Sequence, residues 1–367
     1  MKKIITVVGA RPQFIKAAPL SAVLTGRFNE RMVHTGQHYD EAMSERFFTD
    51  LGIPAPAYNL QVGSASHGVQ TARMLMGIEE IILKERPDGV LVYGDTNSTL
   101  AGALTAVKLH VPVFHVEAGL RSFNRKMPEE HNRVLTDHVS SLLFCPTETA
   151  CMNLAREGIT DGVLNVGDIM ADSVRRFSSA GGAVGPDIHE GDVLQGSVGL
   201  LNLALAEGEY CLSTIHRAES TDDAGVLEGI LNQLGSCGET VVLAAHPRLQ
   251  QHLKNRRLPQ NLFVIKPQGY LQMLALMKGA RAVITDSGGL QKEAYMLQKK
   301  CVTLRSETEW IETLENQWNV LVPPGTGGPE ALVHALQIEP GAWQPLYGDG
   351  HAAERIVEAM ETWFMKN

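Results

Sequence analysis

Acidic side chains stand directly after short apolar runs in the first half of the chain, where they could exchange protons with a substrate. Asp95 and Glu117 each follow such a run. An unpaired carboxylate beside a buried strand is costly to desolvate, which is the setting of a general acid or base. Glu129 and Glu130 follow Pro128 in MPEEHNR and start a helix. The pattern predicts a carboxylate cluster suited to proton transfer.

Each of these acids also has a structural explanation. Asp95 could cap the helix TNSTLAGAL, and Glu117 could form an ion pair with Arg121. Glu129 and Glu130 would be stabilised by the macrodipole in the first turn of any helix, so for either alone the structural explanation is favoured. The convergence of three acidic sites on one sheet edge favours catalysis.

A glycine-rich loop in the second half suits a phosphate. Asp286-Ser287-Gly288-Gly289 follows AVIT and opens the helix LQKEAYML, so its N–H groups and the positive helix end could hold an anion. An ordinary Ser N-cap explains the same residues equally well. Glu293, in the second turn, could reach a ribose hydroxyl or be a solvated acid.

Basic residues and a histidine offer further contacts with an anion. Arg11 stands just before Pro12 at a helix start, where the macrodipole opposes a cation, and Lys16 is opposed more weakly. A bound anion or a neighbouring carboxylate would resolve this conflict. His216, followed by Arg217, ends YCLSTI and could contact a phosphate, transfer a proton or simply be a satisfied hydrogen-bonder.

No metal or cofactor is predicted. His34 and His38 lie on a strand-to-loop segment rather than on one helix face, without H-E-x-x-H or C-x-x-C. No G-x-G-x-x-G follows the first strand, which disfavours a dinucleotide dehydrogenase, and the G-x-S-x-G elbow is absent. The five cysteines are scattered and odd in number, as expected of reduced, mostly buried thiols.

The elements that would position these residues alternate between apolar β-branched runs and helical periods, as in parallel sheets with crossover helices. We predict strands at 3–8, 31–35, 89–93, 111–116, 142–145 and 163–166, and then at 210–214, 240–244, 262–265, 282–285, 301–304 and 319–322. Ligands bind at the carboxyl ends of such strands, where the candidate acids, the basic residues, His216 and the glycine-rich loop are expected.

Two α/β domains of the doubly wound, Rossmann-like type follow from this pattern. The first covers 1–175 and carries the carboxylates, with a final helix at 352–367 that packs back on it. The small-residue segment 178–196 is predicted to be a connection. The second domain covers 176–351 and carries the phosphate-type loop.

Bulk composition excludes several classes of function. The chain has 367 residues, 44% of them hydrophobic, which is enough for two cores. A net charge of −9 disfavours nucleic acid and an anionic membrane as partners. The N-terminal apolar run is too short for a signal sequence, and no segment approaches about 18 uninterrupted apolar residues. The expectation is a soluble, cytoplasmic protein.

The loops together resemble the non-hydrolysing UDP-N-acetylglucosamine 2-epimerase family. VYGDTNSTLAGA, HVEAGLRS, MPEEHNR, TIHRAES and ITDSGGLQKEA match it in order over nearly the whole chain. The resemblance implies two Rossmann-like domains facing across a cleft, as in GT-B glycosyltransferases, a UDP-sugar substrate and a homodimer. Thr96 and Ala118-Gly119-Leu120 stand where hydrolysing relatives carry other residues, which favours the non-hydrolysing branch.

The resemblance also implies roles for single residues. Its catalytic carboxylates match Asp95, Glu117 and Glu129, and its active-site histidine matches His216. Positions that hold UDP match Arg11, Ser287, Gly288, Gly289 and Glu293, to which we add Lys16, Arg217, Met273 and Arg305 as candidate substrate contacts. Met273 replaces an aromatic residue that several members have near the uracil.

Three alternatives remain open on the sequence. A related branch acts on UDP-2,3-diacetamido-2,3-dideoxyglucuronate, whose extra carboxylate would need a cation such as Arg125, Lys126 or Arg305. Arg125 and Lys126 could equally be a solvated loop tip. A retaining glycosyltransferase would need UDP and an acceptor site but no cluster of acids. A nucleotide-sugar sensor would bind the substrate without changing its stereochemistry.

Overall fold

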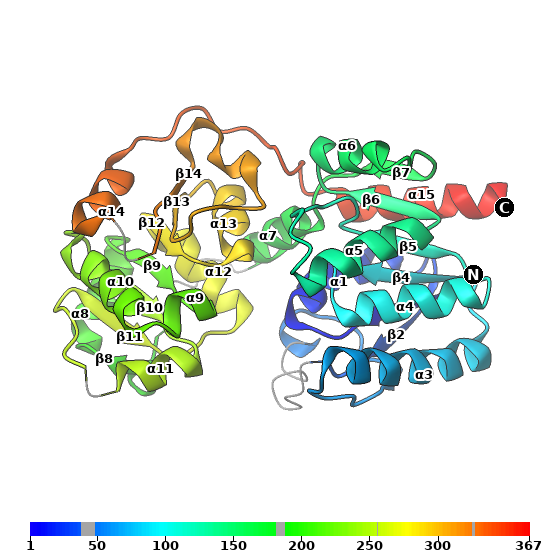
Figure 1. Cartoon of the computed structure of the whole chain (residues 1–367), viewed down its shortest axis with the longest axis horizontal. Coiled ribbons are helices and arrows are strands. Elements are labelled where there is room, and N and C mark those ends of the chain that lie inside the picture. Colours follow the sequence, from blue (N-terminus) through cyan, green and yellow to red (C-terminus); the bar gives the residue numbers. More distant parts are fainter. Residues whose placement is uncertain (38–47, 181–187, 255, 325–326) are drawn as a thin grey trace. The chain divides into compact units, whose positions relative to one another are not determined.

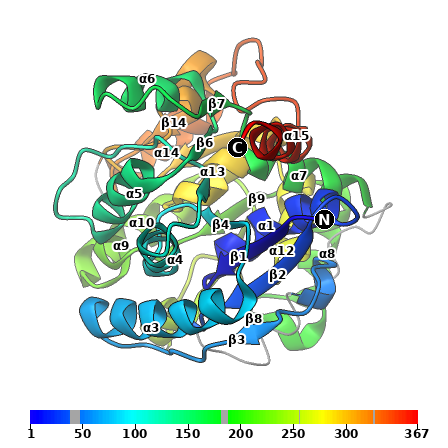
Figure 2. The same ribbon diagram turned by 90° about the vertical axis from the view of Figure 1, so that its right-hand side faces the viewer.

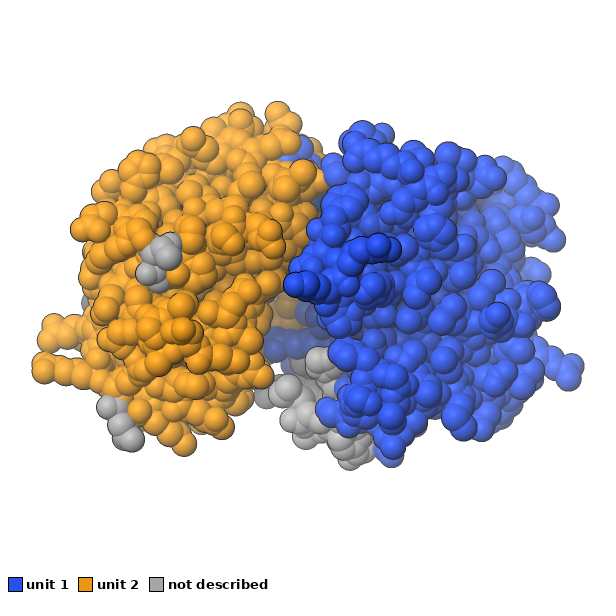
Figure 3. All heavy atoms as spheres, in the orientation of Figure 1, with its two compact units in different colours: residues 1–176, 346–367 blue, residues 177–345 orange. Residues whose placement is uncertain are grey.

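The computed structural model describes residues 1–37, 48–180, 188–254, 256–324 and 327–367 (Figure 1). His38 and residues 181–187 of the predicted connection lie outside the described residues. The chain forms two compact units, one of Met1–Arg176 with Leu346–Asn367 and the other of Phe177–Pro345 (Figure 3).

The first unit contains a seven-stranded parallel sheet in the order β3-β2-β1-β4-β5-β6-β7. This is the doubly wound order, extended by one strand. The strands are β1 (Lys3–Val8), β2 (Asn29–His34), β3 (Tyr58–Asn59), β4 (Gly89–Tyr93), β5 (Val113–Val116), β6 (Leu142–Cys145) and β7 (Val163–Asn165). The central strands β1, β4, β5 and β6 are almost continuously buried and mostly apolar, as expected where helices cover both faces of the sheet.

Helices α3, α4 and α5 lie side by side, and the C-terminal helix α15 packs against α1 (Figures 1 and 2). The helices of this unit are α1 (Arg11–Leu24), α3 (His67–Glu85), α4 (Asn97–Lys108), α5 (Pro128–Val139), α6 (Glu148–Arg156), α7 (Ile169–Ala180, entering the second unit at Phe177) and α15 (Ala352–Lys366). The buried face of α3, with Met74, Ile78 and Ile82, joins the core over β1 and β4.

The second unit contains a seven-stranded sheet in the order β14-β13-β12-β9-β10-β11-β8. The strands are β8 (Val193–Gln195), β9 (Cys211–Thr214), β10 (Val241–Ala244), β11 (Leu262–Ile265), β12 (Ala282–Thr285), β13 (Lys300–Thr303) and β14 (Asn319–Leu321). The helices are α8 (Val198–Glu207), α9 (Ala218–Thr221), α10 (Ala224–Ser236), α11 (Pro247–Leu253), α12 (Tyr270–Gly279), α13 (Gly288–Met296) and α14 (Gly328–Gln337), with 3₁₀ segments η1 (Glu190–Asp192) and η2 (Ile311–Gln317).

The α/β doubly wound class is confirmed, and the main correction concerns the predicted connection. Part of it is ordered: α7 continues to Ala180, and β8 pairs antiparallel with β11. VLQ is too short for its period to be recognised, and only pairing with β11 makes it a strand. The other predicted strands start or end within a few residues of the observed ones. No described helix is long and apolar enough to cross a bilayer.

Each sheet has a switch point where the strand order reverses, and open α/β sheets bind ligands there. In the first unit it lies between β1 and β4, and in the second between β9 and β12. The loops after these strands begin with Gly9, Gly94, Ile215 and Asp286. The fold therefore brings the predicted loops together within each unit.

Candidate active site

Gln13 joins the loops that follow β1 and β4 in the first unit. Its buried Oε1 accepts from the Gly9 N–H at 2.8 Å, and its Nε2 donates to the Tyr93 carbonyl at 2.8 Å. Glycine is required at position 9, because a Cβ there would lie 2.1 Å from Ser98 Oγ. These contacts hold together the carboxyl ends of β1 and β4, and Asp95 lies in the loop that follows β4.

Glu117 directly follows β5 and has a left-handed backbone, with φ +70°. Such a conformation costs a non-glycine residue about 1–3 kcal/mol, so neighbouring contacts must hold it. The N–H groups of Glu117 and Ala118 both donate to the Phe144 carbonyl, each at 3.1 Å. Glu117 Oε2 pairs with Lys16 Nζ and lies 3.2 Å from where a Cβ on Gly94 would be. The strained turn thus directs this carboxylate toward the end of β4.

Asp95 is held by residues of α5. Its carboxylate pairs with Arg133, and its carbonyl accepts from Asn132 Nδ2 at 2.9 Å. The other Nη of Arg133 lies 3.0 Å from Glu130. The side chain that caps α4 belongs to Thr96, so the alternative of Asp95 as the cap is wrong. Arg133 therefore fixes Asp95 from a helix that starts more than thirty residues later in the chain.

The two acids after Pro128 have different surroundings. Glu130 is buried, and its carboxylate accepts from the N–H groups of Ser122 and Phe123, each at 2.9 Å. Burial alone would raise the pKa of Glu130, but these hydrogen bonds and Arg133 outweigh it and lower that pKa. Glu129, the acid matched to the family's catalytic set, is exposed in the first turn of α5.

Sequence reasoning missed a buried charged network beneath the Glu117 turn. Asp137 of α5 contacts His115 and Arg121, each at 2.7 Å. Arg121 also makes two contacts of 2.7 Å with Glu157, so the alternative in which Glu117 pairs with Arg121 is not the arrangement found. The alternation of polar residues in HVEAGLRS was a signal, but nothing in the spacing pointed to Asp137.

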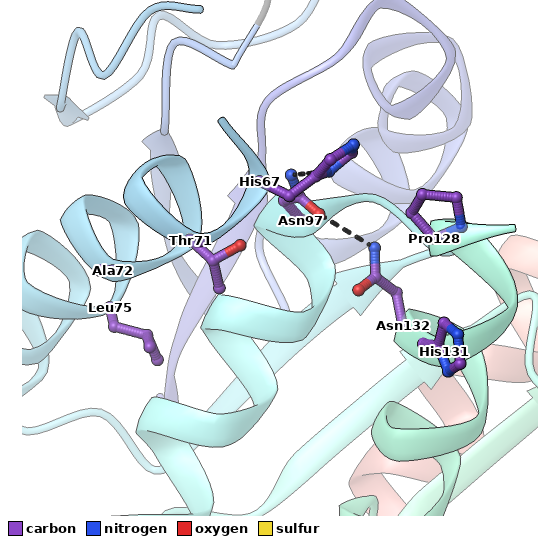
Figure 4. A pocket seen from close by; sticks show the side chains of 9 residues that line it. His67, Thr71, Ala72, Leu75, Asn97, Pro128, His131 and Asn132 are labelled. Atoms are coloured by element: carbon purple, nitrogen blue, oxygen red, sulfur yellow. Dashed lines mark hydrogen bonds between the residues drawn. The ribbon is translucent and has the colours of Figure 1, made fainter. Parts of the chain in front are cut away.

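A shallow pocket of about 390 Å³ lies beside this site in the first unit. Figure 4 shows Asn97 between His67 and Asn132, with hydrogen bonds of 3.1 and 3.2 Å. Its lining comes from the starts of α3, α4 and α5: His67, Gly68, Thr71, Ala72, Leu75, Asn97, Pro128, His131 and Asn132. None of the predicted catalytic or UDP-binding residues lines it, although Asn132 also bonds the Asp95 carbonyl.

His216 is oriented by a buried carboxylate in the second unit. Asp286 is fully buried, accepts from the N–H groups of His216 and Arg217 at 3.0 Å each, and lies 3.0 Å from His216 Nδ1. Burial would raise the pKa of Asp286, but contact with His216 and these N–H groups lowers it. With Nδ1 on Asp286 and the side chain 45% exposed, Nε2 is the ring nitrogen left for a ligand.

The glycine-rich loop has both features expected of it. Ser287 is the N-cap of α13, its side chain accepting from the Leu290 N–H, as the structural alternative proposed. A Cβ on Gly288 would lie 2.4 Å from Glu309 Oε1, so a larger residue there would displace the end of the Glu309 side chain. The corresponding position at Gly289 is open, and no atom comes closer than 3.9 Å. The first N–H groups of α13 are therefore approachable, while Glu293 is buried in the next turn.

The remaining candidates are spread over both units. Arg305 is buried and lies 2.8 Å from Glu309, so its charge is already paired. Met273 is buried in α12. Arg11 begins α1, whereas Arg125 and Lys126 are exposed in the loop before α5. Among the described residues, no cluster of three His, Cys, Asp or Glu could hold a metal ion.

The fold and these loops define an α/β protein of two Rossmann-like units, the architecture of GT-B-like nucleotide-sugar enzymes. The chain belongs to the UDP-N-acetylglucosamine 2-epimerase family, whose model matches residues 23–361. It is therefore an enzyme of the non-hydrolysing epimerase type.

Relatives and solved structures agree over the full length. A UDP-N-acetylglucosamine 2-epimerase homolog of Methanococcus maripaludis is 48% identical, covering 98% of this chain and 99% of its own. The UDP-2,3-diacetamido-2,3-dideoxy-D-glucuronate 2-epimerase of Pseudomonas aeruginosa is 46% identical, covering 97% and 98%. The crystal structure of Methanocaldococcus jannaschii UDP-GlcNAc 2-epimerase with UDP-GlcNAc and UDP has a TM-score of 0.83 at 39% identity, covering 98% and 99%.

Proposed function

We propose that this chain interconverts UDP-N-acetylglucosamine and UDP-N-acetylmannosamine by inverting C2 of the sugar, in the synthesis of surface-polysaccharide precursors. The observation that carries this proposal is the pair of carboxylates at the carboxyl edge of the first sheet. Asp95 and Glu117 follow the neighbouring strands β4 and β5, and each is paired with a cation, Arg133 or Lys16. Two acids at one sheet edge suit removal of a proton from one face and delivery to the other.

The reaction couples proton removal to loss of UDP, because the C2 hydrogen of the sugar is weakly acidic. A carboxylate takes the C2 proton, the bond between C1 and the diphosphate oxygen breaks, and a double bond forms between C1 and C2 to give a glycal. UDP then returns to C1 as a proton reaches the opposite face of C2. Both steps conserve atoms and charge, and no cofactor or metal enters them.

The departing diphosphate gains charge, which Arg11, His216 and the start of α13 are proposed to stabilise. The orientation of His216 by Asp286 supports this role. We expect His216→Ala and Arg11→Ala each to weaken UDP binding or diphosphate departure by about 1.5–3 kcal/mol, the value of a charge-assisted contact. Calorimetric titration with UDP together with steady-state rates measures both, and unchanged values would contradict the role.

Incubation with UDP-N-acetylglucosamine alone tests the proposed activity. An epimerase forms a second UDP-sugar without any acceptor, whereas a glycosyltransferase or a sensor does not. In heavy water the product should carry deuterium at C2, and free UDP with a glycal should accumulate slowly. A product without solvent deuterium would instead indicate hydride chemistry and would refute the elimination route.

A second substrate is favoured by one comparison. The relative named for the diacetamido uronate is 46% identical, between the 48% of the M. maripaludis homolog and the 40% of the UDP-N-acetylglucosamine 2-epimerase of M. jannaschii. Because Arg305 is paired with Glu309, the exposed Arg125 and Lys126 are the better candidates for the extra carboxylate. A kcat/KM advantage for the uronate that disappears in Arg125→Ala or Lys126→Ala would establish this substrate. Failure to turn over the uronate would eliminate it.

A homodimer is also proposed, through the outer face of α3. Val69, Met76 and Leu83 recur every seven residues along this helix and are exposed by 46%, 66% and 59%. Arg73 and Glu80 lie beside this stripe on one flank, three and four residues from Met76. A two-fold axis near Met76 that pairs α3 antiparallel with a second copy places Val69 against Leu83 and Arg73 near Glu80, twice. The face therefore pairs apolar with apolar residues and opposite charges with each other.

A further inference from the structure

We infer that Asp137 is a positioning residue for both Asp95 and Glu117, acting through His115 and the backbone of the turn that follows β5. The inference rests on the proposed function, because it assigns a role relative to the two carboxylates. Asp137 is 1% exposed and so cannot touch a substrate itself. Its effect must pass through the groups it contacts.

The contacts of Asp137 bracket Glu117 on both sides. Oδ1 lies 2.7 Å from His115 Nδ1, two residues before Glu117. Oδ2 accepts from the Gly119 N–H at 3.1 Å and from Arg121 Nη1 at 2.7 Å, two and four residues after it. One carboxylate on α5 therefore fixes the chain where it enters and leaves the turn.

This arrangement explains how the strained turn is maintained. Glu117 and Gly119 both have positive φ, +70° and +79°. A Cβ on Gly119 would lie 2.4 Å from the Ala150 carbonyl, so the turn is pressed against α6. Without the anchor on the Gly119 N–H, Glu117 could relax to an ordinary backbone conformation. Its side chain would then leave Lys16.

His115 extends the same network to Asp95. The ring is fully buried, and its Nε2 lies 2.8 Å from the carbonyl of Gly94, the residue before Asp95. Both ring nitrogens face acceptors, so both hydrogen bonds form only when both nitrogens carry a proton. The ring thus bridges the ends of β4 and β5 and holds Asp95 and Glu117 in a fixed position relative to each other.

The negative charge of Asp137 is stabilised by its neighbours in the network. Burial alone would raise the pKa of Asp137, but contacts with His115 and Arg121 outweigh it and lower the pKa. Asp137 therefore stays ionised and can accept all three hydrogen bonds. An asparagine has the same shape but only one acceptor oxygen, so it cannot serve both His115 and the pair of donors formed by Gly119 and Arg121.

Three variants test the inference, one at Asp137 and two that each remove a different hydrogen bond of His115. Asp137→Asn should lower kcat at least tenfold, with KM and UDP affinity within about twofold. His115→Asn retains a donor at the Nδ1 position and loses the bond to Gly94, whereas His115→Gln retains a donor at the Nε2 position and loses the bond to Asp137. We expect each to lower kcat at least fivefold, because each breaks the bridge at a different end.

Glu30→Gln is the matched control, since Glu30 is a partly buried carboxyl in the same unit, held by Thr6 and Ser21 away from these contacts. All rates are expressed per UDP-binding site, so loss of folded protein does not count as loss of kcat. Variants of Asp137 and His115 with the kcat of Glu30→Gln would overturn the inference. A wild-type protein without C2 exchange in heavy water would instead overturn the proposed function.

Discussion

At the scale of single residues, the structure distinguishes acids that are available for chemistry from acids that hold the chain. Asp95 pairs with Arg133 and Glu117 pairs with Lys16, whereas the carboxylate of Glu130 accepts from backbone and hydroxyl donors as well as contacting Arg133. Asp137 is buried more completely still. Glu117 and Glu130 have the same side-chain exposure of 7%, so the backbone donors to Glu130 and Asp137, rather than burial or residue type, mark these two as acids that hold the chain.

Asp95→Asn and Glu117→Gln should each lower kcat by about 10²–10⁴-fold, the usual contribution of a general acid or base. UDP affinity should change little, because neither acid is proposed to bind the diphosphate. Turnover and UDP titration, measured separately, check this. A variant with wild-type turnover would remove that residue from the mechanism.

The pair Glu129 and Glu130 gives a sharper comparison, since both variants have the same chemistry one position apart. Glu129→Gln should lower kcat without changing stability, because Glu129 is exposed and matches the family's catalytic acid. Glu130→Gln should lower the free energy of unfolding by about 1–3 kcal/mol, because buried donors lose a charged acceptor. Urea denaturation and steady-state kinetics distinguish them; a stable, inactive Glu130→Gln with an active Glu129→Gln would reverse the assignment.

At the scale of elements, the C-terminal helix depends on a side chain from another helix. Asp172 of α7 accepts from the N–H groups of Ala352 and Ala353, at 3.0 and 2.9 Å, and so caps α15. Burial raises the pKa of Asp172 to about 6, although these two N–H groups act in the opposite direction. The attachment of α15 is therefore sensitive to pH.

The sign follows from the direction of this shift. A pKa raised on folding means that the protonated carboxyl is favoured in the native state, so its stabilising effect is present below about pH 4 and is lost as pH rises to about 6. A shift of about 2 units corresponds to roughly 3 kcal/mol. Relative to Asp172→Asn, wild type should lose that amount in unfolding free energy between pH 4 and pH 7. A difference that stays constant across this range would contradict the prediction.

At the scale of the whole molecule, the outer face of α3 predicts a homodimer in which Arg73 of one copy faces Glu80 of the other. Arg73→Glu and Glu80→Arg should each shift the protein toward monomers, because like charges then meet across the two-fold axis. Mixing the two variants should restore dimers, since each supplies the charge that the other lacks. Sedimentation velocity on the separate and mixed proteins measures this.

Two outcomes would contradict the placement of that interface. Met76→Glu, which puts a charge near the proposed axis, should also give monomers; a dimer that survives it uses another surface. Mixed Arg73→Glu and Glu80→Arg proteins that remain monomeric would show that the two residues do not face each other. Glu358→Arg on the exposed side of α15 is a charge change away from α3 and should leave the oligomeric state unchanged.

The sequence by itself determined the α/β class, the two series of strands and the loops that carry chemistry. Period and apolar runs are local properties, and the family motifs are contiguous, so both can be recognised without coordinates. Those motifs predict Asp95, Glu117 and His216 as site residues. Strand bounds do not follow from a local pattern, because pairing with a neighbour decides where a strand ends.

Only the tertiary structure decided which side chains the buried acids contact. Asp137 lies 22 residues from His115, and Asp286 lies 70 residues from His216, so no local pattern connects either pair. The short strand β8 exists only because β11 offers it hydrogen bonds. Contacts between residues distant in the chain depend on how the strands are ordered in the sheet. That order is a property of the packed molecule rather than of any segment.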